Sequence, residues 1–354
     1  MGVIFKAFKD TQTSLEFVLK ISTSYRDGNM SQKKPDQVNR VVDLLRRAGF
    51  KTSDVYKVRS ACFDVVARNG NMILLIKVVN NIDSFAEEQA SQLRLLSYTL
   101  SASVVVVGER TRKDKVEDDT LYERFGIPTI SYNTLEQVLV NGIFPVVYAK
   151  RGGFYVHLNG EKIRQERGKS SYSLGDMAEN LGVSRRTVYE YERNEMDSTL
   201  ETALRLEELL NTSVAIPFNI LSWNVEVDAT TERNIARSLD DELEESVGKM
   251  LSDLGLKVLW SKGTPFDAIT YTQEKSDVVV TGVGHASERK VQSRIEAVGS
   301  FSNIVRSLDM FVLDRSRSSV VKGVPVVSKD ELESMDDASE LLEAISLRSR
   351  RIVQ

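Results

Sequence analysis

The sequence has little of what disulfide or metal chemistry requires. Cys62 is the one cysteine in 354 residues, so the chain can form no internal disulfide, and it suits a reducing compartment such as the cytoplasm. The two histidines, His157 and His285, stand far apart in the sequence, which leaves a histidine–cysteine metal cluster without ligands. We therefore expect no metal site, no cofactor, and no Ser-His-Asp or Cys-His catalytic pairing.

Long apolar runs and a basic overall charge are also missing. No run approaches the roughly 20 apolar residues of a membrane-spanning helix, and Lys6 and Lys9 interrupt the apolar start of the chain, which argues against a signal peptide. The formal net charge of −4 excludes a generally basic nucleic-acid coat but permits a local basic patch. The sequence predicts a cytoplasmic protein of two or three domains with no membrane partner.

Two parts of the sequence repeat one pattern of helices and strands. Each has a helix that stops at a glycine, a strand that begins with Phe-Asp, an apolar strand, a helix leading into another apolar strand, and a strand that contains proline. In the first part Asn69-Gly70 predicts the turn of a hairpin. The matching positions are Gly49 and Gly255, Phe63-Asp64 and Phe266-Asp267, and Pro128 and Pro325. This shared order indicates an internal duplication of one α/β domain.

The middle of the chain has the capping signals of two short helices joined by a tight turn. Ser173 and Asp176 form a capping pattern at the start of the first helix, and Gly182 ends that helix because glycine accepts positive φ. Ser184 is placed to cap the next helix, which we predict over residues 185–193.

This pattern resembles the helix-turn-helix of the Cro and phage-repressor type over residues 159–213. The resemblance rests on a small residue in the first helix, glycine in the turn, apolar residues after the turn and in the second helix, and a trailing helix with Ser198 as its expected cap. The core positions are Ala178, Gly182, Val183 and Val188. The resemblance implies a five-helix domain that binds double-stranded DNA, with helix 185–193 in the major groove.

The second helix carries polar side chains on the side away from this core. Arg185 and Arg186 stand at its N-terminus, where side chains reach base edges, and arginine pairs bidentately with guanine. We predict DNA contacts from Ser173, Ser184, Arg185, Arg186, Thr187, Tyr189 and Glu190. The alternative is an ordinary solvated helix face, which accounts for the arginines but not for the adjacent capped helices.

Charge is distributed unevenly along this domain. Residues 150–193 contain nine lysines and arginines and six acids, a balance of +3, whereas residues 194–213 contain five acids and Arg205, a balance of −4. The positive charge therefore accompanies the helices that would face DNA, and binding should depend on salt.

The whole chain also resembles a group of archaeal proteins described as helix-turn-helix transcriptional regulators, which have a "GGFYV" hairpin before the helix-turn-helix and α/β flanks. That resemblance implies a transcriptional regulator. We predict that it binds double-stranded DNA as a homodimer and that its α/β domains mediate dimerisation or sense an effector of unknown identity. The predicted fold is α/β plus all-α, with two duplicated α/β domains flanking a central five-helix Cro/repressor-type domain. The predicted segments are a disordered N-terminal extension (1–35), the first α/β copy (36–145), the hairpin and helix-turn-helix (146–213), a linker (214–235), the second α/β copy (236–345) and a basic tail (346–354).

A function of another class is open to the first α/β copy. Asp64 on one strand and Lys77 on the next resemble the restriction-endonuclease-like fold, in which Asp and an Asp/Glu-x-Lys pair bind a divalent metal. The second acid would stand at Leu75, and in the second copy Asp267 remains while the lysine position falls near 280–281. Because a hard cation needs several oxygen ligands, we favour a non-catalytic domain over a metal-dependent DNA-processing nuclease. An interaction scaffold is the third alternative.

Overall fold

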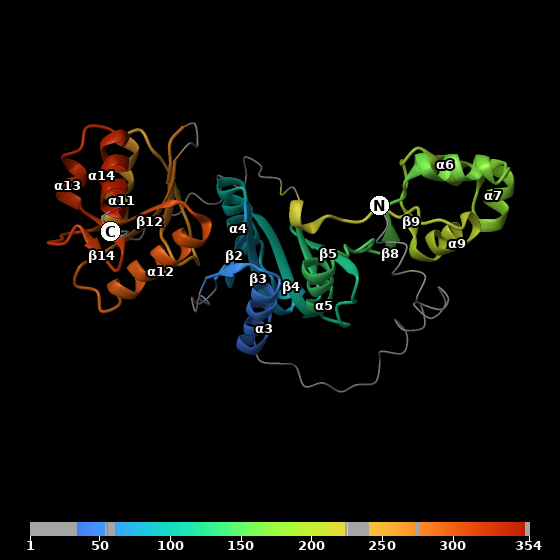
Figure 1. The fold of residues 1–354 in the computed structure, drawn as a ribbon, viewed down its shortest axis with the longest axis horizontal. Coiled ribbons are helices and arrows are strands. Elements are labelled where there is room, and N and C mark those ends of the chain that lie inside the picture. Colours follow the sequence, from blue (N-terminus) through green and yellow to red (C-terminus); the bar gives the residue numbers. More distant parts are fainter. Residues whose placement is uncertain are drawn as a thin grey trace.

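The computed structural model describes residues 34–53, 55, 61–223, 225, 241–273 and 277–350. Figure 1 shows three units in a row, with the second α/β unit at one end, the first in the middle and a helical unit at the other end. The expectations for residues 1–33 and 351–354 lie outside the described residues. Among the described helices, none is long and apolar enough to cross a membrane.

The first α/β unit is built on a sheet whose central strands are buried on both faces. Gly70, at φ +59°, lies in the turn between β2 and β3, and α4 crosses over to place β4 parallel to β3. The four valines of β4 are all buried, as expected for a parallel strand covered on both sides. The elements are α3 (Lys34–Arg47), β1 (Lys51–Thr52), β2 (Val65–Asn69), β3 (Met72–Asn81), α4 (Glu87–Leu100), β4 (Ser103–Arg110), β5 (Thr120–Arg124), β6 (Ile127–Ile130) and α5 (Tyr132–Glu136).

The second α/β unit has the same strand topology. Its order β10-β11-β12-β13-β15-β14 corresponds strand by strand to β1-β2-β3-β4-β6-β5, with the same parallel and antiparallel pairings. Its elements are α11 (Glu242–Asp253), β10 (Lys257–Trp260), β11 (Ala268–Tyr271), β12 (Val278–Gly284), α12 (Val291–Val305), β13 (Leu308–Leu313), β14 (Val320–Val321), β15 (Val324–Ser328), α13 (Lys329–Glu333) and α14 (Ala338–Arg350). The two units therefore agree in the order and the directions of their strands.

The two α/β units pack against each other within the chain. The rings of Phe63 and Phe301 lie 5.6 Å apart, and both side chains are fully buried in an apolar cluster that draws on both units. Arg68 donates a hydrogen bond of 2.6 Å to the carbonyl of Val305, and the amide of Cys62 donates one of 3.0 Å to Gly263. A shared core fixes the units relative to each other.

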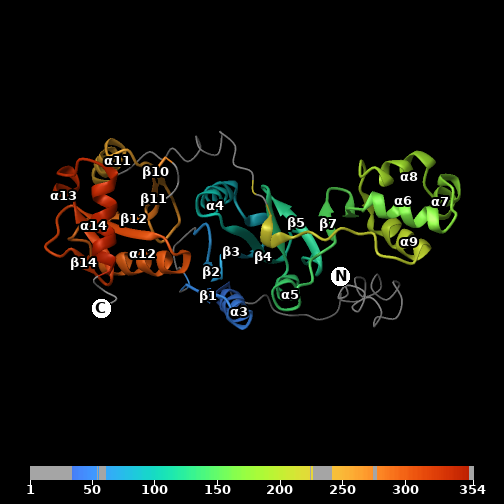
Figure 2. The same cartoon turned by 45° about the horizontal axis from the view of Figure 1, so that its top comes forward.

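The helical unit has its own core and is connected to the first α/β unit by a sheet. Strand β5 pairs in parallel with β7, which continues through β8 to β9, so that one nine-stranded sheet runs from β1 to β9. Figure 2 shows β7 between that sheet and the helices. The elements are β7 (Val147–Lys150), β8 (Gly153–Val156), α6 (Gly160–Lys169), α7 (Leu174–Leu181), α8 (Arg185–Glu192), β9 (Ser198–Thr199) and α9 (Leu200–Leu210). In residues 146–213, all described, there are four α-helices where the sequence predicted five.

Two predicted boundaries are wrong. The linker predicted from residue 214 is packed as far as Trp223, because the amide of Ile216 bonds to His157, that of Phe218 bonds to Pro145, and Trp223 donates to Gly126. The basic tail predicted from residue 346 continues α14 as far as Arg350. Its Arg348 is anchored, since it pairs with Glu331 and donates to the carbonyl of Val326.

Candidate nucleic-acid interface

The helix-turn-helix begins with a capping box. The hydroxyl of Ser173 accepts a hydrogen bond from the amide of Asp176 at 3.1 Å, and the Asp176 carboxylate accepts one from the amide of Ser173 at 2.8 Å. These bonds from Ser173 hold the pKa of Asp176 below its usual range. Reciprocal bonds of this kind satisfy two of the free amides of a helix N-terminus. Helix α7 therefore starts where the sequence predicted.

The turn between α7 and α8 is made by glycine and closed by serine. Gly182 has φ +68°, a left-handed conformation that costs glycine no steric strain. The amide of Val183 then bonds to the carbonyl of Ala178 at 3.0 Å. The Ser184 hydroxyl accepts from the amide of Thr187 at 3.0 Å and caps α8. The predicted Ser-x-x-Asp, glycine and serine signals all have their expected local geometry.

The predicted core residues separate from the predicted contact residues. Ala178, Val188 and Tyr191 are buried in the apolar cluster of the helical unit, and the half-buried Val183 packs against that cluster. On the other side of α8, Arg185 and Arg186 are exposed and Tyr189 is 47% exposed. Among the other predicted contact residues, Ser173 and Ser184 are exposed, while Thr187 and Glu190 are half-buried.

Side chains on the exposed face of α8 hold one another in place. Arg186 pairs with Glu190 at 2.8 Å, one helical turn away. Arg193 donates to the Tyr189 hydroxyl at 3.1 Å and pairs with Glu195 at 2.6 Å, so it belongs to this face although the sequence reading took it only as the end of the helix. The exposed face of α8 is thus a row of arginines with interleaved acids.

Gly175 was missed by the sequence reading. A Cβ atom at this position of α7 would stand 2.9 Å from Nη2 and 3.0 Å from Nε of Arg185. The missing side chain leaves room for the guanidinium of Arg185 beside the N-terminal turn of α7. The signal was a glycine inside a helical pattern, which usually has a packing reason.

Helix α8 is attached to α6 by a bidentate ion pair and a close backbone contact. Nε and Nη2 of Arg167 lie 2.5 and 3.2 Å from the carboxylate oxygens of Glu192, whose side chain is only 5% exposed. At the other end of α6, a Cβ atom on Gly160 would lie 2.4 Å from the carbonyl oxygen of Tyr191, so that position accepts only glycine. These contacts fix the orientation of α8 relative to α6.

The cap predicted for the third helix is displaced by one residue. Thr199 caps α9 by accepting from the amide of Thr202 at 3.2 Å. Ser198 is instead fully buried in β9, where it pairs with Val156 of the hairpin. Because Ser198 pairs with Val156, which is distant in the sequence, the adjacent Thr199 is the residue that caps α9.

The nuclease-like position of the first α/β unit has one acid and two cations. Asp64 accepts a hydrogen bond from the amide of Val78 at 2.8 Å and lies 2.9 Å from Lys34 and 3.5 Å from Lys77. Burial lowers the pKa of Lys77 despite the attraction of Asp64. Leu75, at the place of the second acid, is fully buried in the apolar core. Within the described residues, no group of three or more His, Cys, Asp or Glu side chains could hold a metal ion.

The second unit repeats this arrangement with another cation. Asp267 accepts from the amide of Val283 at 2.8 Å, as Asp64 does from Val78. In this register Gly282, and not residue 280 or 281 as expected, stands at the position that corresponds to Lys77. A Cβ atom on Gly282 would lie 2.3 Å from the ring of Phe311. The cation comes from α12 instead, where Arg294 lies 2.7 Å from Asp267.

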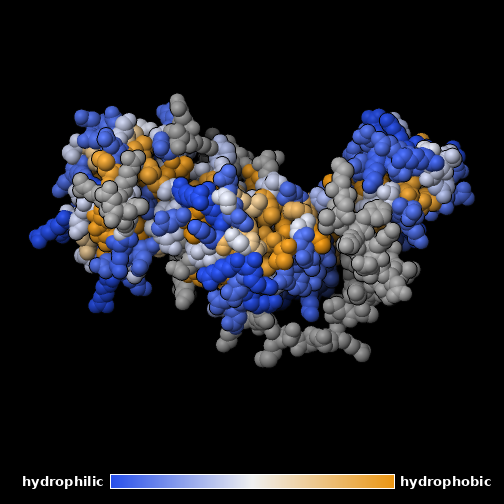
Figure 3. All heavy atoms as spheres, viewed as in Figure 1, coloured by the Kyte–Doolittle hydropathy of each residue, from blue (hydrophilic) through white to orange (hydrophobic). Residues whose placement is uncertain are grey.

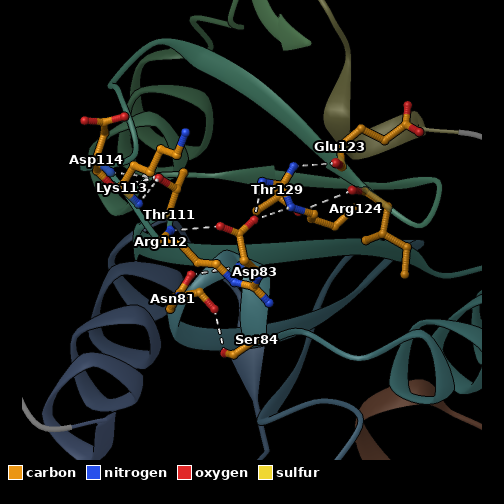
Figure 4. A network of polar contacts seen from close by, with 11 residues as sticks. Asn81, Asp83, Ser84, Thr111, Arg112, Lys113, Asp114, Glu123, Arg124 and Thr129 are labelled. Atoms are coloured by element: carbon orange, nitrogen blue, oxygen red, sulfur yellow. Dashed lines mark hydrogen bonds and ion pairs between the residues drawn. The ribbon is translucent and has the colours of Figure 1, made fainter. Parts of the chain in front are cut away.

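A second polar cluster lies beside the first sheet, around Asp83 (Figure 4). Asp83 accepts hydrogen bonds from the amide of Arg112 at 2.8 Å and from Nη2 of Arg124 at 2.6 Å. An open cavity of about 510 Å³ adjoins it, lined by Asp83, Phe85, Thr111, Arg112, Lys113, Asp114, Arg124 and Phe125. The cavity lies in the first α/β unit and is open to solvent.

The contribution of the Arg167–Glu192 pair to the stability of the helical unit can be tested by substitution. Arg167→Met leaves the buried Glu192 carboxylate without its partner, and we expect a loss of about 3 kcal/mol in the free energy of unfolding of the helical unit. Arg205→Met is the matched control, because its pair with Glu201 is exposed on both sides and should contribute less than about 0.5 kcal/mol. Thermal and urea unfolding measure both. Equal stability of the two variants would contradict the assigned role of Arg167.

Comparison with known proteins agrees with this geometry. The model of a PD-(D/E)XK superfamily domain matches residues 34–145, and a helix-turn-helix model matches residues 163–216. The chain thus combines a PD-(D/E)XK superfamily domain with a helix-turn-helix of the Cro/repressor type.

Relatives match nearly the whole chain. An HTH-type transcriptional regulatory protein of Thermococcus gammatolerans is 38% identical over 88% of this chain and 96% of its own length. Those of Pyrococcus abyssi, at 38% over 89% and 98%, and Archaeoglobus fulgidus, at 35% over 88% and 97%, carry the same description. Among solved structures, a SinR protein/SinI protein complex matches 27% of this chain and 82% of that chain at 25% identity, with a TM-score of 0.15 that carries no argument. The chain belongs to this archaeal family of HTH-type transcriptional regulatory proteins.

Proposed function

We propose that the protein is a sequence-specific transcriptional regulator that reads duplex DNA with α8 in the major groove. The observation that carries the proposal is the exposed row of Arg185, Arg186 and Tyr189 on a short helix whose opposite face is fully packed. The caps and the Arg167–Glu192 pair support it, because they fix the helix without using these side chains. A base-reading helix needs this division between packed and free faces.

The two arginines are assigned different roles within this proposal. Arg186 is 86% exposed at its side chain and paired only with Glu190 of its own helix, so it can exchange that partner for a guanine edge. Arg185 stands beside the N-terminal turn of α7. Because helix N-termini lie against phosphates in this class of complex, we assign Arg185 to the DNA backbone and Arg186 to a base.

Substituting these arginines tests the proposal. On a duplex site selected from a random pool, Arg186→Ala should cost about 1–3 kcal/mol of binding free energy and relax specificity at one position. Arg185→Ala should weaken all sequences alike and reduce the salt dependence. Fluorescence anisotropy at several salt concentrations measures both effects.

The matched control is the double variant Arg289→Ala, Lys290→Ala, two adjacent exposed cations that precede α12 in the second α/β unit. It should bind DNA as the wild type does. If the Arg185→Ala, Arg186→Ala double variant also keeps wild-type affinity and salt slope, α8 is not the reading helix.

We also propose that the PD-(D/E)XK unit is not a nuclease. The support is chemical: Leu75 offers no oxygen ligand, and the single carboxylate of Asp64 already accepts an amide and faces two ammonium groups. A divalent cation at this place would meet one acid and two positive charges, which does not suit its coordination.

Incubation of the pure protein with supercoiled plasmid and Mg²⁺ or Mn²⁺ tests this second point. We expect no nicking above a buffer control. Metal-dependent nicking that Asp64→Asn abolishes would establish the nuclease alternative. Asp64→Asn is preferred to alanine because its side-chain oxygen can still accept the bond from the amide of Val78 and fills the same space.

Dimerisation and effector sensing are the finer parts of the same proposal. Figure 3 shows apolar surface over the middle of the molecule, where the first α/β unit lies, and Val140 and Ile143 of that unit are 54% and 42% exposed. We assign homodimer contacts to the exposed apolar side chains of Val140 and Ile143, and effector sensing to the cavity beside Asp83. Sedimentation equilibrium of Val140→Glu against wild type tests the first assignment, since an unchanged dimer would refute it.

A further inference from the structure

The hairpin between the α/β unit and the helices has an unexplained tip. The hairpin tip, residues 150–154, consists of Lys150, Arg151, Gly152, Gly153 and Phe154, all exposed. No acid occurs between Ile143 and Gly160, so the two charges of the tip have no acidic neighbour in their own segment. The strands are closed by the two-residue turn Arg151-Gly152, between the paired residues Lys150 and Gly153, and closing such a turn does not require its two cations.

The tip is held rigidly beside the segment that follows α8. Tyr155 and Val156 of β8 pair with Thr199 and Ser198 of β9, the strand between α8 and α9. On its other side β8 pairs with β7, which is fixed to β5 of the α/β unit. The tip therefore projects from a sheet edge whose position is set by both neighbouring units.

The tip also has the chemistry of a phosphate contact. Nζ of Lys150 donates a hydrogen bond of 3.4 Å to the Tyr148 hydroxyl and lies 4.5 Å from the centre of the Tyr155 ring. An ammonium group has three donors, so it can bind a phosphate while it keeps this bond. Gly152 and Gly153 have φ +106° and +145°, and a Cβ on Gly153 would have nothing within 4 Å. With no side chains there, a phosphate can approach the backbone amides as well as Arg151.

We propose that the hairpin tip is a second DNA-contacting element, which binds backbone phosphates beside the bases that α8 reads. This rests on the proposed function of α8. We assign both cations of the tip to phosphates, so the tip contributes affinity and salt dependence rather than sequence preference. The sheet makes its distance from α8 constant, and the phosphates it binds therefore lie at a constant offset from the sequence motif.

The experiment compares Lys150→Gln, Arg151→Gln with wild type on the selected duplex. We expect binding about tenfold weaker at moderate salt, and a slope of log affinity against log salt that is smaller by about 1.8, since each phosphate contact contributes roughly 0.9. The base preferences of the variant should equal those of the wild type. The control is Arg317→Gln, Lys322→Gln, two exposed cations at the β14–β15 end of the second α/β unit, which should change neither quantity.

A second measurement uses the unaltered protein. Ethylation interference on the wild-type complex should reveal phosphates outside the base motif, and these should lose their effect when the Lys150→Gln, Arg151→Gln variant is used. Wild-type affinity and salt slope in that variant, with no such phosphates, would overturn the proposal while leaving α8 as the reader. Failure of the wild type to bind any duplex would instead refute the proposed function, and the hairpin assignment with it.

Discussion

The pairing of β5 with β7 is the constraint on which the placement of the helix-turn-helix depends. Thr120 and Leu121 pair in parallel with Val147 and Tyr148, and the ladder continues through β8 into β9. Hydrogen-bonded strands fix distance and register, unlike a flexible linker. The chain segment after Ser213 then bonds to His157 and Pro145, which flank β8 and β7, and forms a second connection. A DNA-binding helix on this support has its orientation to the α/β unit set before it meets DNA, so the separation of half-sites in a dimer would follow from the fold.

The acid of the nuclease-like strand pair has the same structural contacts in both α/β units. In both units a carboxylate at the start of a strand accepts the amide of the neighbouring strand and is neutralised by a cation. In one unit the cations are Lys34 of α3 and Lys77 of β3, and in the other the cation is Arg294 on the crossover helix. Such an acid stabilises the strand pair as a hydrogen-bond acceptor, a role that needs no metal ion. The units bury their facing surfaces in one another, and this leaves the first unit's remaining surface for partners.

Much of the helix-turn-helix could be predicted from sequence because its determinants are local. The caps at Ser173 and Ser184 and the positive φ of Gly182 each involve residues within four positions, and the buried face of α8 follows from helical spacing. The succession of helices and strands in the α/β units could also be predicted from their sequence pattern, whereas the order of the strands in the sheets was not predicted. Contacts between distant segments could not be predicted: Arg167 with Glu192, the packing of residues 214–223, and Val156 with Ser198, which moved a cap to Thr199. The room that Gly175 makes for Arg185 is equally invisible without coordinates.

The most direct test of DNA reading by α8 is selection of bound duplexes from a random pool with the full-length protein. The structure predicts enrichment of one motif, two-fold symmetric if the protein binds as a dimer, with guanine at the position that faces Arg186. Sequencing after successive rounds measures the enrichment directly. A pool that stays random, although the protein is folded and the salt concentration is low, would contradict the assignment of α8 as a sequence-reading helix.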